Sequence, residues 1–215
     1  MDPKANLVGK AGLEQIQIVL HRRSRGKKRL KQAILAITFL AFSWLAMQGV
    51  HELGHVLGAL LTGGRPDKVY LHPLIISATA VFPNPHPVMV LWSGPILGTL
   101  IPLGAACLAY ALKWPGAYLY RFFAGFCAVM NGIYIGAGPF FPIGDTESLR
   151  AYGCPLWAML LFGLPSLMLG LYLWNNQGPH FGLGKAKGQV DTGATITSSC
   201  LLVTLVIAEL IANAW

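Results

Sequence analysis

The sequence predicts an all-α, multi-pass membrane protein with about five transmembrane helices and a short β-hairpin or strand segment between the first two. Two observations predict this class. Of the 215 residues, 54% are hydrophobic and only 11% are charged, whereas soluble domains carry about 25% charged residues. The chain also contains several apolar runs close to the ~20 residues that a helix needs to cross a bilayer. These features exclude a disordered chain and an ordinary water-soluble globule.

A basic arm, residues 1–32, precedes the apolar runs. Residues 1–31 hold nine lysines and arginines against two acidic residues, so 9 − 2 gives +7 of the net charge of +8. A basic segment followed directly by apolar helices is typical of an anchor beside anionic lipid. The arm therefore favours the lipid bilayer as a partner and argues against nucleic acid.

The positions of the other cations predict the orientation of the chain. With a cytoplasmic N-terminus, thirteen lysines and arginines lie on the cytoplasmic side and three on the other side, in agreement with the positive-inside rule. The arm does not have the composition of an organelle transit peptide. We therefore expect an integral protein of a bacterial inner membrane with its N-terminus in the cytoplasm.

The spans are expected in the following order. The first covers 33–50 and reaches Thr62 if the helix continues through His51. Further spans are expected at 88–112, 122–138, 155–174 and 198–215. A glycine-rich stretch, 175–197, has the composition of a flexible linker. This order divides the chain into the arm, a membrane core over 33–150, and two additional C-terminal spans with their linker over 151–215.

Between the first two spans the helical pattern gives way to β-prone residues. Residues 69–71 and 75–82 are rich in β-branched and aromatic side chains, and Pro73 separates them. This pattern indicates a short hairpin. The alternative is a plain loop at the membrane surface, and the sequence does not decide between the two.

The residues with the clearest chemistry are His51, Glu52 and His55, which form an HExxH motif at the end of the first apolar run. A spacing of four on a helix places both imidazoles on one face, where they can bind a single Zn²⁺ ion while Glu52 acts as general base. Ionisable residues inside a membrane helix are costly and by default indicate a functional site. Two histidines that merely bond neighbouring helices would explain neither the glutamate nor the spacing.

A catalytic zinc ion usually has three protein ligands, so a third must come from elsewhere in the chain. Asp145 is the best placed candidate, because it follows a stretch rich in proline and glycine, 138–144, that should unwind a helix at membrane depth. Irregular backbone there is tolerated only when it is buried in protein or lines a polar cavity. The remaining candidates are Glu147 and the loop and arm histidines His21, His72, His86 and His180.

These motifs are similar to those of the site-2-protease-type intramembrane zinc metalloproteases. The resemblance rests on HExxH at 51–55, on Ser93-Gly94-Pro95, and on Pro142-Ile143-Gly144-Asp145, and it covers roughly 33–150. It implies that His51, His55 and Asp145 bind one Zn²⁺ per chain and that Glu52 is catalytic. The chain departs from the family's Asn-x-x-Pro-x-x-x-x-Asp-Gly pattern at Ala137, Phe140 and Thr146.

The expected function is hydrolysis of peptide bonds in membrane-spanning or membrane-adjacent segments of a protein substrate. No substrate-binding residue follows directly from the sequence. The candidates are Val69, Tyr70, Val81 and Asn131. Three Gly-x-x-x-Gly pairs, one on each of the first three spans, should let the helices around the metal approach closely.

Other functions fit the same residues less well. An inactive, protease-like scaffold or chaperone that binds transmembrane helices would not need an intact HExxH. A membrane di-iron oxygenase needs several histidine clusters, and the six scattered histidines do not supply them. A prenyl-protein-type zinc endopeptidase would need a glutamate as its third ligand, and only Glu147 or Glu209 could serve. Neither the oligomeric state nor the membrane face nearest the site follows from the sequence.

Overall fold

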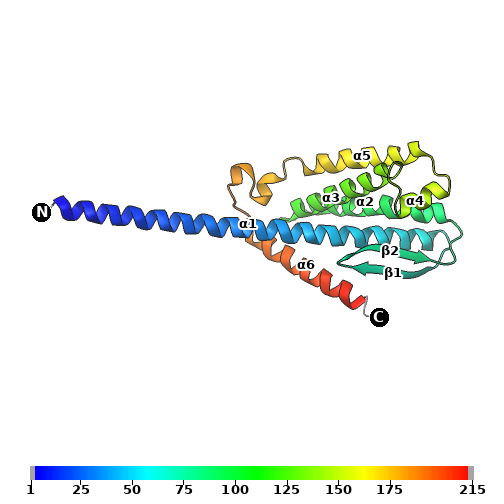
Figure 1. The fold of residues 1–215 in the computed structure, drawn as a ribbon, viewed down its shortest axis with the longest axis horizontal. Coiled ribbons are helices and arrows are strands. Elements are labelled where there is room, and N and C mark those ends of the chain that lie inside the picture. The colour runs from blue at the N-terminus through cyan, green and yellow to red at the C-terminus, as the bar shows by residue number, and fades with distance from the viewer. Residues whose placement is uncertain (1–2, 213–215) are drawn as a thin grey trace.

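The computed structural model describes residues 3–212, and side chains from residue 22 onward. Its longest element is helix α1 (Pro3–Leu61), which carries the basic arm and the first span without a break and projects far beyond the other helices (Figure 1). The expected continuation of the helix through the HExxH motif is confirmed, with an end one residue before Thr62. The arm is a helical extension of the first span.

Four more helices are long and apolar enough to cross a membrane: α2 (Pro87–Ala111), α3 (Ala117–Ala137), α5 (Leu156–Trp174) and α6 (Thr192–Ala212). With the part of α1 from Arg22 to Leu61, they make five candidate spans. The predicted class, a multi-pass membrane protein of helices, is therefore confirmed. A short helix, α4 (Asp145–Ala151), lies between α3 and α5.

The segment after α1 is a hairpin and not a plain loop. Strands β1 (Pro66–His72) and β2 (Ile75–Val81) pair antiparallel, with Tyr70 opposite Ala78. Phe82 N–H donates to the Arg65 carbonyl, which closes the open end of the hairpin. The β-prone residues form strands here because the two runs, joined by a tight turn, can hydrogen-bond to each other through their backbone N–H and C=O groups.

The elements pack on two sides of α1. Helices α2 and α3 lie on one side, with α5 packed on the far side of α3, and the hairpin and α6 lie on the other (Figure 1). The close approach of α1 to α2 depends on glycine: a methyl group on Gly54 would meet the backbone of Ser93 and Gly94. The glycines of α3 were expected to let α3 approach the helices around the metal site. Instead, Gly132 and Gly136 pack against Gly163 of α5.

Two expected boundaries need correction. The fifth span begins at Thr192 and not at 198, because Asp191 caps the helix through a 2.7 Å bond from Gly193 N–H to its Oδ1. Residues 213–215 of the expected span lie outside the described residues. The linker accordingly ends at residue 191, and it forms two 3-10 turns, Gly178–Phe181 and Gly184–Ala186. The third span begins at Ala117, earlier than the expected 122.

Candidate metal centre

The two histidines of HExxH lie on the face of α1 that is covered by α2 and α3. His51 and His55 are buried, with 8% and 5% of their surface exposed. His51 Nδ1 lies 2.8 Å from Asn131 Oδ1, and the Asn131 amide NH₂ donates to the Cys127 carbonyl. His55 Nδ1 lies 2.8 Å from the Val90 carbonyl. Because both partner oxygens only accept hydrogen bonds, each Nδ1 carries a proton, and each ring turns its Nε2 atom toward the site.

Asp145 lies beside the Nε2 atoms of both histidines, although it is 94 residues from His51 in the sequence. Its backbone N–H donates to the Tyr134 hydroxyl at 2.7 Å, and the hydroxyl donates to the Ile143 carbonyl. Gly144, directly before it, has φ +54° and leaves no room for a side chain beside Tyr134. Thr146 also fixes this turn, because its hydroxyl accepts from Ile143 N–H. Thr146, one of the residues at which the chain departs from the pattern of the similar family, thus closes the turn.

Three ligand atoms converge at this site. His51 Nε2 and Asp145 Oδ2 are 3.0 Å apart, His55 Nε2 and Asp145 Oδ2 are 3.2 Å apart, and the two Nε2 atoms are 3.1 Å apart. Zn²⁺ with bonds of ~2.05 Å in a tetrahedron separates its ligands by about 3.3 Å. A slight expansion of the triangle therefore admits the ion. Two Nε2 atoms and a carboxylate oxygen this close together share either protons or a metal ion, so the residues fit a metal.

The charge of Asp145 supports the same conclusion. Burial opposes ionisation of its carboxyl group, yet the hydrogen bonds and attraction from His51 and His55 hold the pKa of Asp145 well below its usual range. The carboxylate is therefore ionised at neutral pH and available as a ligand. With any Nε2 proton displaced, the three residues would offer one negative charge and two imidazole nitrogens to a divalent cation.

The other candidates for the third ligand lie elsewhere. Within the part of the chain described, the cluster of possible ligands consists of His51, His55 and Asp145. Glu147 is on α4 but exposed. His72 lies at the hairpin turn, where its Nδ1 accepts from Leu74 N–H, and His180 stacks on Tyr118. The side chain of His21 lies outside the described residues, and His86 is exposed before α2.

Glu52 is buried between α1 and the hairpin, with 3% of its surface exposed. The Ser77 hydroxyl donates to its Oε1 at 2.7 Å, and the Thr79 hydroxyl donates to its Oε2 at 2.6 Å. Ser77 N–H also donates to Gln48 Oε1 at 3.0 Å. Strand β2 is therefore attached to α1 at the residue proposed as general base. These hydroxyls were not anticipated from the sequence, although Ser77 and Thr79 alternate along the strand and must share one face.

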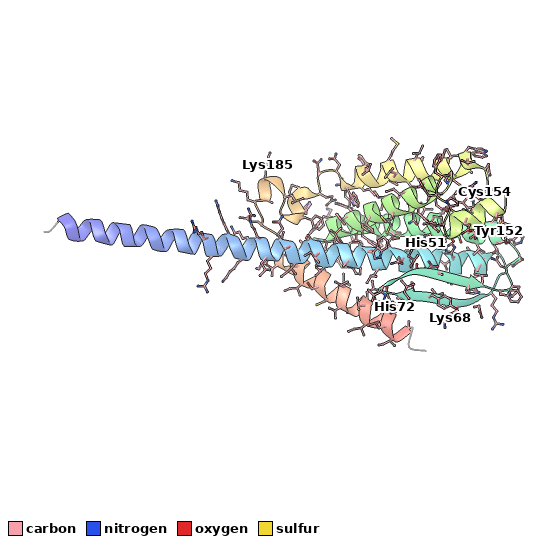
Figure 2. All side chains as sticks on the ribbon, in the orientation of Figure 1. His51, Lys68, His72, Tyr152, Cys154 and Lys185 are labelled. Atoms are coloured by element: carbon pink, nitrogen blue, oxygen red, sulfur yellow. The ribbon has the colours of Figure 1, made fainter. Side chains whose placement is uncertain are left out.

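A cavity of about 600 Å³ contains the three ligands and Glu52. Strand β2, the 143–145 turn and α3 form its walls. Of the candidate substrate residues, Val81 and Asn131 line it, whereas Val69 and Tyr70 lie on β1. Figure 2 shows His51 within the bundle and Tyr152, another lining residue, at the end of the bundle remote from the basic arm.

Gly94 offers a test of this geometry. A methyl group there would collide with the imidazole of His55, so Gly94→Ala should displace one candidate ligand and reduce bound metal at least tenfold, as losses of ligand support do. Gly104→Ala is the matched control, because Gly104 lies on the same helix with open space around it. The measurement is metal content by elemental analysis after purification. Equal metal content in both variants would contradict the assigned position of His55.

Searches with this chain against protein-family models, curated proteins and solved structures found no match.

Proposed function

We propose that this protein is an intramembrane zinc metalloprotease of the site-2-protease type. The observation that carries the proposal is the convergence of His51, His55 and Asp145 within 3.2 Å, in one cavity with the buried carboxylate of Glu52. Residues 94 apart in sequence meet here, in a chain built of membrane-spanning helices. The test is cleavage of a single-span membrane substrate by purified protein, with Glu52→Gln as the decisive variant.

The chemistry follows from the positions of the side chains. Zn²⁺ held by the three ligands would supply Lewis-acid chemistry, lowering the pKa of water and polarising a peptide carbonyl. Glu52 takes a proton from the attacking water and returns it to the leaving amine. Each Glu52 oxygen accepts one hydroxyl hydrogen bond and keeps a second lone pair for the proton. Asn131 and the Val90 carbonyl hold the histidine rings in the tautomer that binds metal.

Strand β2 is the proposed binding edge for substrate. A membrane helix must unwind before its amides can be attacked, and an extended segment can then pair with a free strand edge. Phe82 N–H points toward the β1 side and donates to the Arg65 carbonyl. Ser77 N–H points in the opposite direction and donates to Gln48 Oε1 on α1. The second edge of β2 therefore faces α1 and the cavity. Asn84, which lines the cavity beyond this strand, has a buried Oδ1 without a partner among the described residues and can accept a substrate N–H.

Val81 tests this edge. Because backbone N–H groups alternate along a strand, Val81 N–H points away from β1 and toward the cavity. Val81→Pro should remove a donor to the substrate and lower cleavage about tenfold, the loss expected for one hydrogen bond, while zinc content stays at the wild-type level. Val81→Ala keeps the N–H and is the control. Equal cleavage by both variants would contradict pairing at β2.

The proposed location is a bacterial inner membrane, with the arm in the cytoplasm. Thirteen of the sixteen lysines and arginines then lie on the cytoplasmic side, in agreement with the positive-inside rule. In this orientation α1 runs outward, which would place the metal site nearer the opposite face. The competing function, a scaffold that binds membrane helices without cleaving them, is favoured by the departures at Ala137 and Phe140. The intact Glu52 and its hydroxyl partners favour the enzyme.

A further inference from the structure

We propose a binding site for the phosphate headgroup of an anionic phospholipid, in a groove between the basic arm and the linker that follows α5. The groove has a volume of about 530 Å³. Arg25, Arg29 and Gln32 of α1 form one wall, and residues 182–188 of the linker form the other. The site is separate from the metal centre and does not depend on proteolysis.

The groove is held in a fixed shape by contacts between its walls. Gln32 Nε2 donates to the Phe181 carbonyl at 3.0 Å. Gly182, with φ +73°, lies so close that a methyl group there would come within 3.1 Å of the Gln32 amide. Gly188, with φ +81°, packs against the backbone of Arg29 and the Lys28 side chain. These glycines bring the linker backbone close to α1 and leave its wall of the groove open to a headgroup.

The charge of the groove favours an anion. Arg25 and Arg29 are one helical turn apart, and Lys187 faces them from the linker. Like charges at this spacing repel one another. Both ion pairs found within residues 22–212 involve Asp145, so none of the three cations has a carboxylate partner there. A phosphate group can accept bidentate hydrogen bonds from an arginine and neutralise the cluster.

The position of the groove identifies the source of the phosphate as a lipid. Gln32 is followed directly by the apolar part of α1, and Lys31 Nζ donates to Thr192 Oγ1 at the start of α6. Helix α5 ends at Trp174, directly before the linker. Figure 2 shows Lys185 at this end of the bundle, opposite Tyr152. Leu183, 57% exposed on the groove wall, adds an apolar side chain beside the cations, the combination typical of a membrane interface.

Two double variants distinguish a specific lipid site in the groove from general electrostatic attraction between the basic arm and anionic lipid. Arg25→Gln/Arg29→Gln removes two cations from the groove. Arg23→Gln/Lys27→Gln removes two cations at the same spacing from the same helix, but these line a different crevice. The full-length protein in detergent is titrated with dioleoylphosphatidylglycerol, dioleoylphosphatidylcholine or inorganic phosphate. Thermal unfolding and the number of lipids retained in native mass spectrometry are measured.

Phosphatidylglycerol should stabilise the wild type saturably, and the groove variant should bind it about tenfold or more weakly, given the contribution of each cation near a lipid surface. The control variant should stay within about threefold of the wild type. Lys187→Gln, on the exposed linker, should weaken phosphatidylglycerol binding by a smaller factor. This variant replaces the groove double variant in the test if the double variant does not fold. Equal loss in both double variants would overturn the site. An equal effect of phosphatidylcholine, or of inorganic phosphate, would overturn the anionic lipid as its ligand.

Discussion

Replacing Asp145 by alanine is expected to reduce bound zinc from about one ion per chain to nearly none. In the proposed site the carboxylate supplies one of three protein ligands and the only negative charge among them. Loss of a residue that merely supports a ligand typically lowers metal affinity 10–100-fold, and we expect loss of the ligand itself to exceed about 100-fold. The measurement is zinc per chain by elemental analysis of protein purified without chelators.

Glu147→Ala is the matched control for this variant. Glu147 is also an acidic residue in the first turn of α4, but it is exposed. Zinc should therefore remain at the wild-type level in Glu147→Ala. Retention of zinc in Asp145→Ala together with its loss in Glu147→Ala would move the third ligand and favour the prenyl-protein-type endopeptidase. A wild type that binds no zinc would favour the scaffold.

Replacing Glu52 by glutamine should abolish peptide hydrolysis and leave the metal in place. Glutamine keeps the shape of the side chain. Its Oε1 can still accept from one of the Ser77 and Thr79 hydroxyls, and its NH₂ group can donate to the oxygen of the other, but it cannot take a proton from water. General acid–base groups typically contribute about 10²–10⁴-fold to a rate, so cleavage of a single-span substrate should fall by at least about 100-fold. The measurements are the rate of product formation and the zinc content of the same preparation.

The Glu52 variant also separates the two proposed functions. An enzyme loses its activity in cells when Glu52 becomes glutamine, whereas a scaffold that binds membrane helices continues to work. Gln48→Ala is a useful comparison, because Gln48 also lines the cavity and contacts β2, but its amide has no part in proton transfer. If Glu52→Gln supports full function in cells with zinc bound, the proteolytic function is wrong.

The sequence determined the helices and the common face of two candidate ligands, His51 and His55, but left the hairpin and a plain loop as alternatives. Long apolar runs specify helices in a bilayer because the backbone must satisfy its own polar groups there. The spacing of His51 and His55 fixes both rings on one helical face before any tertiary contact forms. The predicted starts of the fifth and third spans were wrong. These helices begin earlier, at Thr192 and Ala117, in polar or aromatic residues that local caps and turns hold in the first helical turn.

Only the tertiary structure decided the remainder of the site. Among Asp145, Glu147 and the loop histidines, the choice depends on how the 138–144 turn folds, and Tyr134 and Thr146 fix that turn by contacts that no spacing reveals. The partners of Glu52 come from a separate strand, and the glycines of α3 serve α5 instead of α1. The physical reason is that periodicity reports which face of an element is apolar, whereas the atoms that meet across two elements depend on how those elements pack together.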